Sequence, residues 1–324
     1  MDNSTANTNV GRVARINPNM VAPQMSPTST ENQNNNAVDV QKPQTVKSPY
    51  ERSGVDSTVG GKRNNESSIT GGAYQPVLIT EVCELPSKGL LYSALGSTLE
   101  LRAMTTIEER MRLSGENFWS TMTAILNRCK VGTDYDMSNL TDFDFFAALV
   151  KLRIISYGNN YKTQAKCLKC GKEQIVNVNL DEVRCSMLED DFVEPFEIGP
   201  LPMSGDILTC RFLRLYDHIS ISNEVNSWLK KHPNDVMNNP EYTLTMEKML
   251  VTVNGIKLND MQKRHYVENM VGADSTMFHD KIDNMFYGIH RLGTCKCEEK
   301  DCGATVLYQI APSESFFRAT PLDN

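Results

Sequence analysis

The chain has 324 residues, enough for one large or two ordinary domains with a hydrophobic core. Its net charge of −7 argues against a protein that works along nucleic-acid backbones, because such proteins draw affinity from cationic side chains. No stretch approaches the ~18 consecutive apolar residues of a membrane span. Nine cysteines without a secretory signal indicate a reducing compartment, where thiols bind metal or lie in cores.

The N-terminal segment has a composition of its own. Residues 1–72 are rich in Asn, Ser, Thr, Gln, Gly and Pro, and the first aromatic residue is Tyr50. Such a segment cannot bury enough apolar surface to offset its chain entropy, so we expect a disordered polar tail. The folded part is expected to begin near Tyr74.

Strands are expected first. Residues 76–79 are apolar and β-prone, residues 85–89 supply turn chemistry, and residues 98–102 alternate like a half-buried strand. Thr105 and Glu108 then have capping-box spacing, which predicts the beginning of a short helix.

Two longer helices should follow. Apolar residues at three- and four-residue intervals predict a helix over residues 118–129. The clearest pattern covers residues 141–157, because Thr141 can cap that helix and Gly158 can end it. Its expected core stripe consists of Phe145, Phe146, Ala148, Leu149, Leu152 and Ile155.

The second half repeats this order in outline. Residues 159–180 predict a strand, a cysteine turn and a strand, and the acidic residues of 186–195 predict a solvated connector. The elements expected beyond it are a strand at 207–213, a helix at 216–231, a helical or mixed segment at 242–253, a helix at 275–292 that Gly293 ends, and a strand at 304–310. Both halves run turn, strand, helices, glycine, cysteine knuckle and strand, which is a repeat of architecture with weak residue identity.

Two cysteine knuckles give the strongest signal in the sequence. Cys167 and Cys170 are three positions apart, and Gly171 permits a tight reversal after them. In the second knuckle, residues 295–303, the pair Cys302-Gly303 matches Cys170-Gly171. Two knuckles that face each other form the sulfur cage of a zinc ribbon, and thiolate-rich tetrahedral coordination favours zinc over an iron–sulfur cluster.

The second knuckle offers three cysteines for two places. We prefer Cys297 with Cys302, because a four-residue gap lies within the usual range, and Cys295 is the alternative ligand. Cys185 or His290 could also take a place. The expected structural zinc ligands are Cys167, Cys170, Cys297 and Cys302. The fold class that follows is α+β, with helices and short β-hairpins closed by a zinc-ribbon-like four-cysteine site.

The expected division of the chain follows from these features. Its parts are the polar tail (1–72), an N-terminal α/β half (73–165), the first zinc knuckle with its hairpin (166–185), a C-terminal helical and β half (186–293), and the second knuckle with a closing strand (294–324).

The sequence contains few features that indicate an enzyme. The five histidines show no His-Glu-x-x-His spacing, and no glycine-rich phosphate loop lies in the required frame. A four-thiolate site has no open position for water. A redox Cys-x-x-Cys pair begins a helix, whereas strand-like sequence follows Cys170. We therefore expect neither an enzyme nor a small-molecule substrate.

A family resemblance rests on several motifs in order. They are Leu-Pro-Ser-Lys-Gly-Leu-Leu-Tyr (85–92), Leu-Glu-Leu-Arg (99–102), Thr-Thr-Ile-Glu-Glu (105–109), Leu-Thr-Asp-Phe-Asp (140–144), Leu-Arg-Ile-Ile-Ser-Tyr-Gly (152–158) and the first knuckle. Over about residues 78–180 this order resembles the baseplate hub proteins of T4-type contractile-tailed bacteriophages. The resemblance implies assembly of the tail baseplate hub through contacts with other phage baseplate and tail proteins, without catalysis. It implies a location in the virion tail baseplate, or in the host cytoplasm during assembly.

The alternative is a nucleic-acid-binding or transcription-related factor that uses the zinc ribbon. Lys166, Lys169 and Lys172 make the first knuckle basic. The acidic overall charge and the lack of aromatic residues beside these lysines argue against this alternative.

Overall fold

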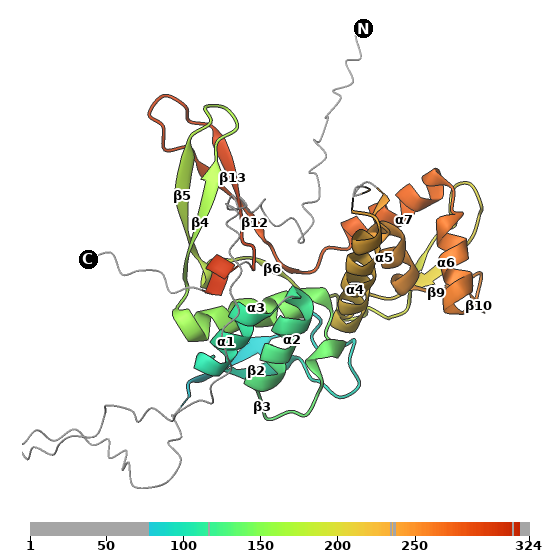
Figure 1. Ribbon diagram of the computed structural model, residues 1–324, viewed down its shortest axis with the longest axis horizontal. Coiled ribbons are helices and arrows are strands. Elements are labelled where there is room, and N and C mark those ends of the chain that lie inside the picture. Colours follow the sequence, from blue (N-terminus) through green and yellow to red (C-terminus); the bar gives the residue numbers. More distant parts are fainter. Residues whose placement is uncertain (1–77, 116, 234, 236–237, 313, 318–324) are drawn as a thin grey trace, which may run out of the picture. The chain divides into compact units, whose positions relative to one another are not determined.

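The computed structural model describes residues 78–317 except for positions 116, 234, 236–237 and 313 (Figure 1). These residues form a mixed α and β structure with several small antiparallel sheets, as the sequence predicts. The polar tail predicted over residues 1–72 lies outside the described residues. The predicted division at residues 73, 166, 186 and 294 stays a prediction.

The first half begins with a three-stranded antiparallel sheet in the order β1-β2-β3. Its elements are β1 (Thr80–Glu84), β2 (Thr98–Arg102), α1 (Thr106–Ser114), α2 (Phe118–Cys129), β3 (Lys130–Val131) and α3 (Asp142–Tyr157). The predicted capping box is confirmed, because the Glu108 side chain accepts from the Thr105 amide at 2.9 Å. Of the strand expected at 76–79, residues 76–77 lie outside the described residues and residues 78–79 are not strand, so that β1 begins at Thr80.

The second half repeats this layout with a four-stranded sheet in the order β10-β9-β8-β7. Its elements are β7 (Phe196–Ile198), β8 (Leu208–Cys210), α4 (Leu215–Lys231), α5 (Glu241–Met249), β9 (Leu250–Val253), β10 (Ile256–Lys257), α6 (Asp260–Glu268) and α7 (Gly272–Asn284). The predicted helix at 216–231 is confirmed, and the mixed segment at 242–253 divides into α5 and β9. Sequence reasoning missed α6, which has its own capping box at Asn259 and Gln262.

Each half continues into a β-hairpin. The hairpins are β4 (Asn160–Lys166) with β5 (Glu173–Asn179), and β12 (Leu292–Lys296) with β13 (Thr305–Gln309). A short pair, β6 (Cys185–Ser186) with β11 (Gly288–Ile289), connects segments of the two halves. In Figure 1 the two hairpins lie side by side, in agreement with the close contact of β4 and β13.

The helix α3 is the centre of the largest hydrophobic cluster. Its core face is wider than the predicted stripe, because Phe143, Ala147 and Val150 are also buried. Ile155, which the prediction included, is only half-buried. A helix that is apolar on most sides needs cover on most sides. The strands β1, β2 and β11 and the C-terminal segment provide part of it.

The predicted helix at 275–292 is wrong in its second part, since α7 ends at Asn284. Gly288 has φ +87°, and a Cβ there would lie 2.8 Å from the Cβ of Phe143. The predicted helix stop, Gly293, lies inside β12, where a Cβ would collide with the Tyr308 ring. Both glycines therefore allow close packing of extended chain, and neither ends a helix.

Gly288→Ala should destabilise the protein by about 2–4 kcal/mol, because the positive φ and the contact with Phe143 both oppose a side chain. Gly132→Ala is the matched control, since Gly132 has φ +69° but open space around it. Urea denaturation compares them; equal losses for the two variants would show that the contact with Phe143 contributes nothing.

The acidic connector differs from its prediction at one end. Asp190 and Asp191 are exposed, as expected, whereas Leu188 is fully buried. Glu194 forms an ion pair with Arg214 and accepts from the Phe212 amide at 2.6 Å. This carboxylate thus holds the connector to the beginning of α4.

The internal repeat extends to individual side chains. Arg102 makes a two-pronged contact with Glu108 beside α1, and Arg211 makes the same contact with Asp217 at α4. In each case the carboxylate lies six positions after the arginine and also accepts a hydrogen bond from a backbone amide. The donor is Thr105 for Glu108 and Arg214 for Asp217.

A second pair of contacts repeats as well. Two similar turns each donate a backbone hydrogen bond to a buried aspartate in the first turn of a helix. These turns are Leu-Pro-Ser-Lys-Gly (85–89) and Leu-Pro-Met-Ser-Gly (201–205). Ser87 donates to Asp144 of α3 at 2.8 Å, and Met203 donates to Asp274 of α7 at 2.7 Å. The two halves therefore share strand order, turn chemistry and capping, which indicates a duplicated unit.

The halves meet where α2 contacts α4. The rings of Trp119 and His218 stack there with centroids 4.2 Å apart, and His218 Nε2 has no hydrogen-bond partner among the described residues. Burial lowers the pKa of His218 from its ordinary value of 6.5, although Asp142, Asp217 and Glu241 oppose this shift.

This lowered pKa predicts a pH dependence of stability. A histidine that is buried neutral contributes fully above its unfolded-state pKa, and its contribution falls as pH drops below about 6.5. The free energy of unfolding should therefore decrease from about pH 7.5 to about pH 5, and His218→Phe should reduce this slope. An unchanged slope in the variant would assign the dependence to other groups.

Candidate metal centre

The first knuckle is the turn between β4 and β5. The Cys167 amide donates to the Lys172 carbonyl and the Gly171 amide donates to the Cys167 carbonyl, both at 2.8 Å. Gly171 has φ +76°, which closes the turn with little strain because glycine has no Cβ. The two sulfurs of this knuckle thereby lie at one end of the hairpin.

The second knuckle joins β12 to β13. The Cys297 amide donates to the Ala304 carbonyl at 2.9 Å, and the Cys302 amide donates to the Glu299 carbonyl at 3.1 Å. Gly303 directly follows the second cysteine of this knuckle, as Gly171 does in the first. Its φ of +56° is positive, like that of Gly171. The sequence match between the two Cys-Gly pairs is therefore a match of turn geometry as well.

The structure brings the sulfurs of Cys167, Cys170, Cys297 and Cys302 within 4.8 Å of one another. The distance from Cys167 Sγ to Cys302 Sγ is 3.7 Å, and the distance from Cys170 Sγ to Cys297 Sγ is 3.6 Å. A tetrahedral ion with Zn–S bonds of about 2.3 Å needs sulfurs about 3.8 Å apart. These two sulfur–sulfur distances match those around a zinc-sized ion.

The cluster is partly shielded from water. Cys167 and Cys297 are buried, Cys302 is half-buried and Cys170 is exposed. Ala165 and Val306 pack beside them in a small apolar cluster at this end of the hairpins. Such a site is held by sulfur ligands and a thin apolar layer.

The pKa values of the clustered thiols are shifted in different directions. Amide hydrogen bonds from Cys170 and Lys169 lower the pKa of Cys167 to about 6 despite its burial. At Cys297 an amide of Glu299 favours the thiolate, but burial and the neighbouring sulfurs raise the pKa to about 12. Several thiolates this close together need a cation, because otherwise their charges repel one another.

The alternative ligands lie outside this cluster. The Cys295 sulfur accepts a hydrogen bond from Gln174 at 3.3 Å, and His290 Nε2 lies 2.8 Å from the Ser186 hydroxyl. Cys185 belongs to the short strand β6. The remaining cysteines, Cys83, Cys129 and Cys210, are buried in the hydrophobic clusters of the two halves.

Gln174 is a residue that sequence reasoning missed. It is 6% exposed on the inward face of β5, and its amide donates to the Lys296 carbonyl and accepts from the Glu298 amide, both at 3.0 Å. It therefore holds the backbone on either side of Cys297. The one signal in the sequence is a polar residue at an inward position of an alternating strand.

Gln174→Ala should make the centre release its metal about tenfold faster, because groups that orient ligands typically affect affinity by that much or more. Transfer of zinc to a coloured chelator measures the rate. Gln164→Ala on the exposed face of β4 is the control. Equal rates for the two variants would show that Gln174 does not position Cys297.

The lysines of the first knuckle all have partners within the knuckles. Lys166 lies 3.9 Å from Glu173, Lys172 lies 3.0 Å from Glu299, and Lys169 donates to the Cys302 carbonyl at 3.0 Å.

Within the described ranges, the four-cysteine cluster is the single group of side chains arranged to hold a metal ion. None of the helices in the described part of the chain is long and apolar enough to cross a membrane.

Comparison with known proteins gives the class to which this two-halved α+β protein belongs. Residues 78–318 match the family described as T4 bacteriophage base plate protein. The match covers most of the chain, so the protein belongs to this family, as its sequence motifs suggested. Membership implies a place in the phage tail baseplate, among other phage structural proteins. No curated protein and no solved structure matched the chain.

Proposed function

We propose that the protein is a structural or assembly component of the baseplate hub and that a zinc ion held by its four clustered cysteines closes its fold in the manner of a zinc ribbon. The observation that carries this proposal is the sulfur cluster itself. Two of its members follow the first half of the duplicated fold and two follow the second. A metal there ties together two hairpins that are far apart in the chain.

Zinc suits this donor set better than other metals. Soft thiolate ligands in a tetrahedral arrangement select zinc or iron–sulfur clusters. The sulfur separations of 3.6 and 3.7 Å match a single central ion. A lone ion with four thiolates is a closed site, so its role in this proposal is to hold structure and not to activate water.

A role without catalysis agrees with the other charged groups of the fold. Four of the buried carboxylates, Glu108, Asp144, Asp217 and Asp274, accept hydrogen bonds at helix beginnings and turns. These groups hold backbone segments in place. We propose that the protein acts through contacts with other baseplate and tail proteins and has no small-molecule substrate.

The contacts of the knuckle lysines give little support to the alternative function, a nucleic-acid-binding factor. Lys166, Lys169 and Lys172 are engaged with acidic groups or a carbonyl inside the knuckles. Phosphate binding would have to compete with these contacts.

The test is isolation of phage tail assembly intermediates from cells that express a tagged full-length protein. We expect the tagged protein to co-sediment with baseplate intermediates and with identified hub proteins. DNA binding is measured in parallel at several salt concentrations. Absence from every tail intermediate, together with steeply salt-dependent DNA binding, would overturn the proposal in favour of the alternative function.

A further inference from the structure

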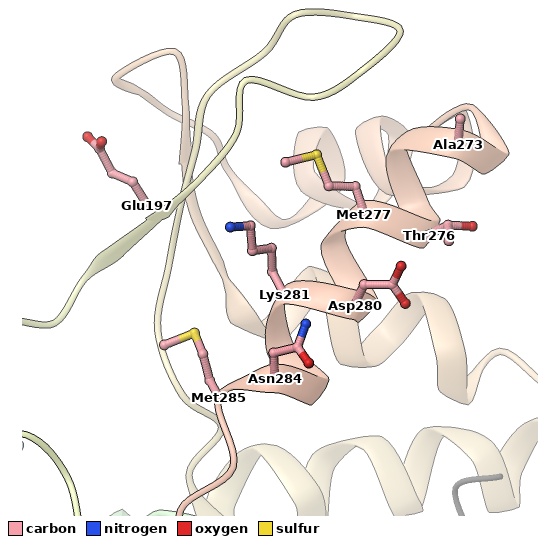
Figure 2. A pocket seen from close by; sticks show the side chains of 8 residues that line it. All are labelled: Glu197, Ala273, Thr276, Met277, Asp280, Lys281, Asn284 and Met285. Atoms are coloured by element: carbon pink, nitrogen blue, oxygen red, sulfur yellow. The ribbon is translucent and has the colours of Figure 1, made fainter. Parts of the chain in front are cut away.

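A groove of about 560 Å³ lies between the strand β7 and the helix α7. Figure 2 shows Glu197 of β7 on one side, and Thr276, Asp280 and Lys281 of α7 on the other. Met277 and Met285 also line it. The strand β7 is at the edge of its sheet, so one side of its backbone has no partner strand within residues 78–317 as far as they are described.

The internal repeat shows what this groove corresponds to. Asp144 and Asp274 occupy the same position in α3 and α7. Each accepts a hydrogen bond from a backbone amide of an equivalent turn. Counted from these aspartates, Phe143, Phe146 and Val150 of α3 correspond to Ala273, Thr276 and Asp280 of α7. The groove face of α7 is therefore the counterpart of one definite face of α3.

In the first half that face is covered by extended chain. Gly288 of β11 packs against Phe143, and Ile289 lies beside Phe146 and Val150. The Arg291 guanidinium lies over the Phe146 ring at 4.3 Å. A segment of about four residues thus lies along α3, and its fit depends on the absence of a side chain at Gly288.

In the second half the same face is exposed and polar. Phe143, Phe146 and Val150 are at most 8% exposed, whereas Ala273, Thr276 and Asp280 are all exposed. Lys151 of α3 pairs with Glu81 of the edge strand β1 at 3.1 Å. Its counterpart Lys281 has no ion pair among the described residues, although Glu197 lies across the groove.

We propose that this groove binds an extended segment of another baseplate protein, placed along α7 as residues 288–291 lie along α3. The free edge of β7 would pair with its backbone, which is the usual way an extended peptide adds to a sheet. Glu197 and Asp280 select a basic side chain in the segment, and Lys281 selects an acidic one. Met277 and Met285 adapt to its apolar side chains.

The lining mixes charged side chains with two methionines, as surfaces do whose partners are also soluble before they associate. The partner is a different protein and not a second copy. In this chain the segment that covers such a face, residues 288–291, is already packed against α3. This inference rests on the proposed role in baseplate assembly, and it adds the surface and the kind of partner.

The test places a photo-crosslinking amino acid at Thr276 of the full-length protein in phage-producing cells. The matched control is the same substitution at Met261 of α6, which is 84% exposed and outside the groove. We expect Thr276 to cross-link to one segment of one identified baseplate protein, and Met261 not to do so. Cross-links from Thr276 to a second copy, to residues 1–77 of the same chain, or at the control level would overturn the inference.

A substitution provides the second measurement. Thr276→Arg should reduce incorporation into baseplate intermediates at least tenfold without a change in thermal stability, and Met261→Arg should leave incorporation unchanged. Normal incorporation of Thr276→Arg would overturn the inference. The role in assembly is tested separately: it fails if the wild-type protein itself is absent from the intermediates, whereas only the groove fails if Thr276→Arg behaves like wild type.

Discussion

Cys170→Ser and Cys302→Ser should each lower the zinc content from one ion per chain to nearly none. Each variant removes one of four sulfurs that lie within 4.8 Å of one another, and each leaves three crowded thiols without a complete site. Structural zinc can contribute on the order of 10 kcal/mol in small domains. The loss here should be confined largely to the hairpins, because the small apolar cluster around the cysteines consists of residues of the two hairpins and their knuckles.

The remainder of the molecule has its own support. The clusters around α3 and around α4 and α5 are large, and they contain none of the four clustered cysteines. Tyr161, Val178 and Ile310 at the base of the hairpins belong to the first of these clusters. Hydrogen exchange should therefore become much faster near the knuckles, less so at the hairpin base, and remain unchanged in α2 and α3.

Metal analysis by mass spectrometry and hydrogen exchange on the same samples measure these effects. Cys295→Ser and Cys185→Ser are controls, since both thiols lie outside the cluster and both variants should keep one zinc. If the Cys170 and Cys302 variants retained full zinc and normal exchange at the knuckles, the cluster would not be a metal site. Loss of zinc from Cys295→Ser alone would move the ligand assignment to Cys295.

The sequence was most informative where local rules and tertiary packing agree. The helices at 118–129 and 142–157 and the strand at 98–102 have the predicted bounds to within one residue. Their capping residues and periodicity depend on near neighbours in the chain. The predicted helix at 275–292 failed beyond Asn284, and the extended chain after it packs at Gly288 against Phe143, which is far away in sequence. No local pattern carries that information.

The candidate site shows the same limit. The spacing of the cysteines predicts the four residues that the structure brings together, but it left Cys295 and Cys297 as alternatives. The hydrogen bonds of Gln174, which hold Cys295 and the backbone around Cys297, distinguish them. Gln174 lies on the other hairpin, so its role could be seen only after the two hairpins were placed together. The repeat was visible in outline, and the paired Arg–carboxylate contacts now support it.

Glu108→Gln should lower the free energy of unfolding by about 3 kcal/mol at neutral pH. Glu108 is fully buried and accepts from Arg102 at 3.0 Å, from Arg128 at 2.8 Å and from the Thr105 amide at 2.9 Å. Glutamine keeps the shape but removes the charge, so two arginines lose their partner. Urea denaturation measures the loss, and Glu109→Gln, at a partly exposed neighbour in α1, is the control.

The pH dependence of this loss tests its cause. Burial opposes ionisation of Glu108, but hydrogen bonds from Arg102 and Thr105 hold its pKa well below the ordinary value of 4.5. A carboxylate with a lowered pKa contributes stability above its unfolded-state pKa and loses that contribution as pH falls further. The difference between wild type and Glu108→Gln should therefore shrink as pH drops below about 4.5. A difference that stayed constant would indicate altered packing and not lost charge.

The repeat extends this prediction to the second half. Asp217 accepts from Arg211 at 2.7 Å and from the Arg214 amide at 2.8 Å, as Glu108 does from Arg102 and Thr105. Asp217→Asn should cost about the same 3 kcal/mol, and the two losses should add in the double variant, because the two carboxylates share no partner. Additive losses mean that each half keeps its own capped sheet and helix. A double variant much less stable than the sum would mean that the halves support each other across the contact of α2 with α4.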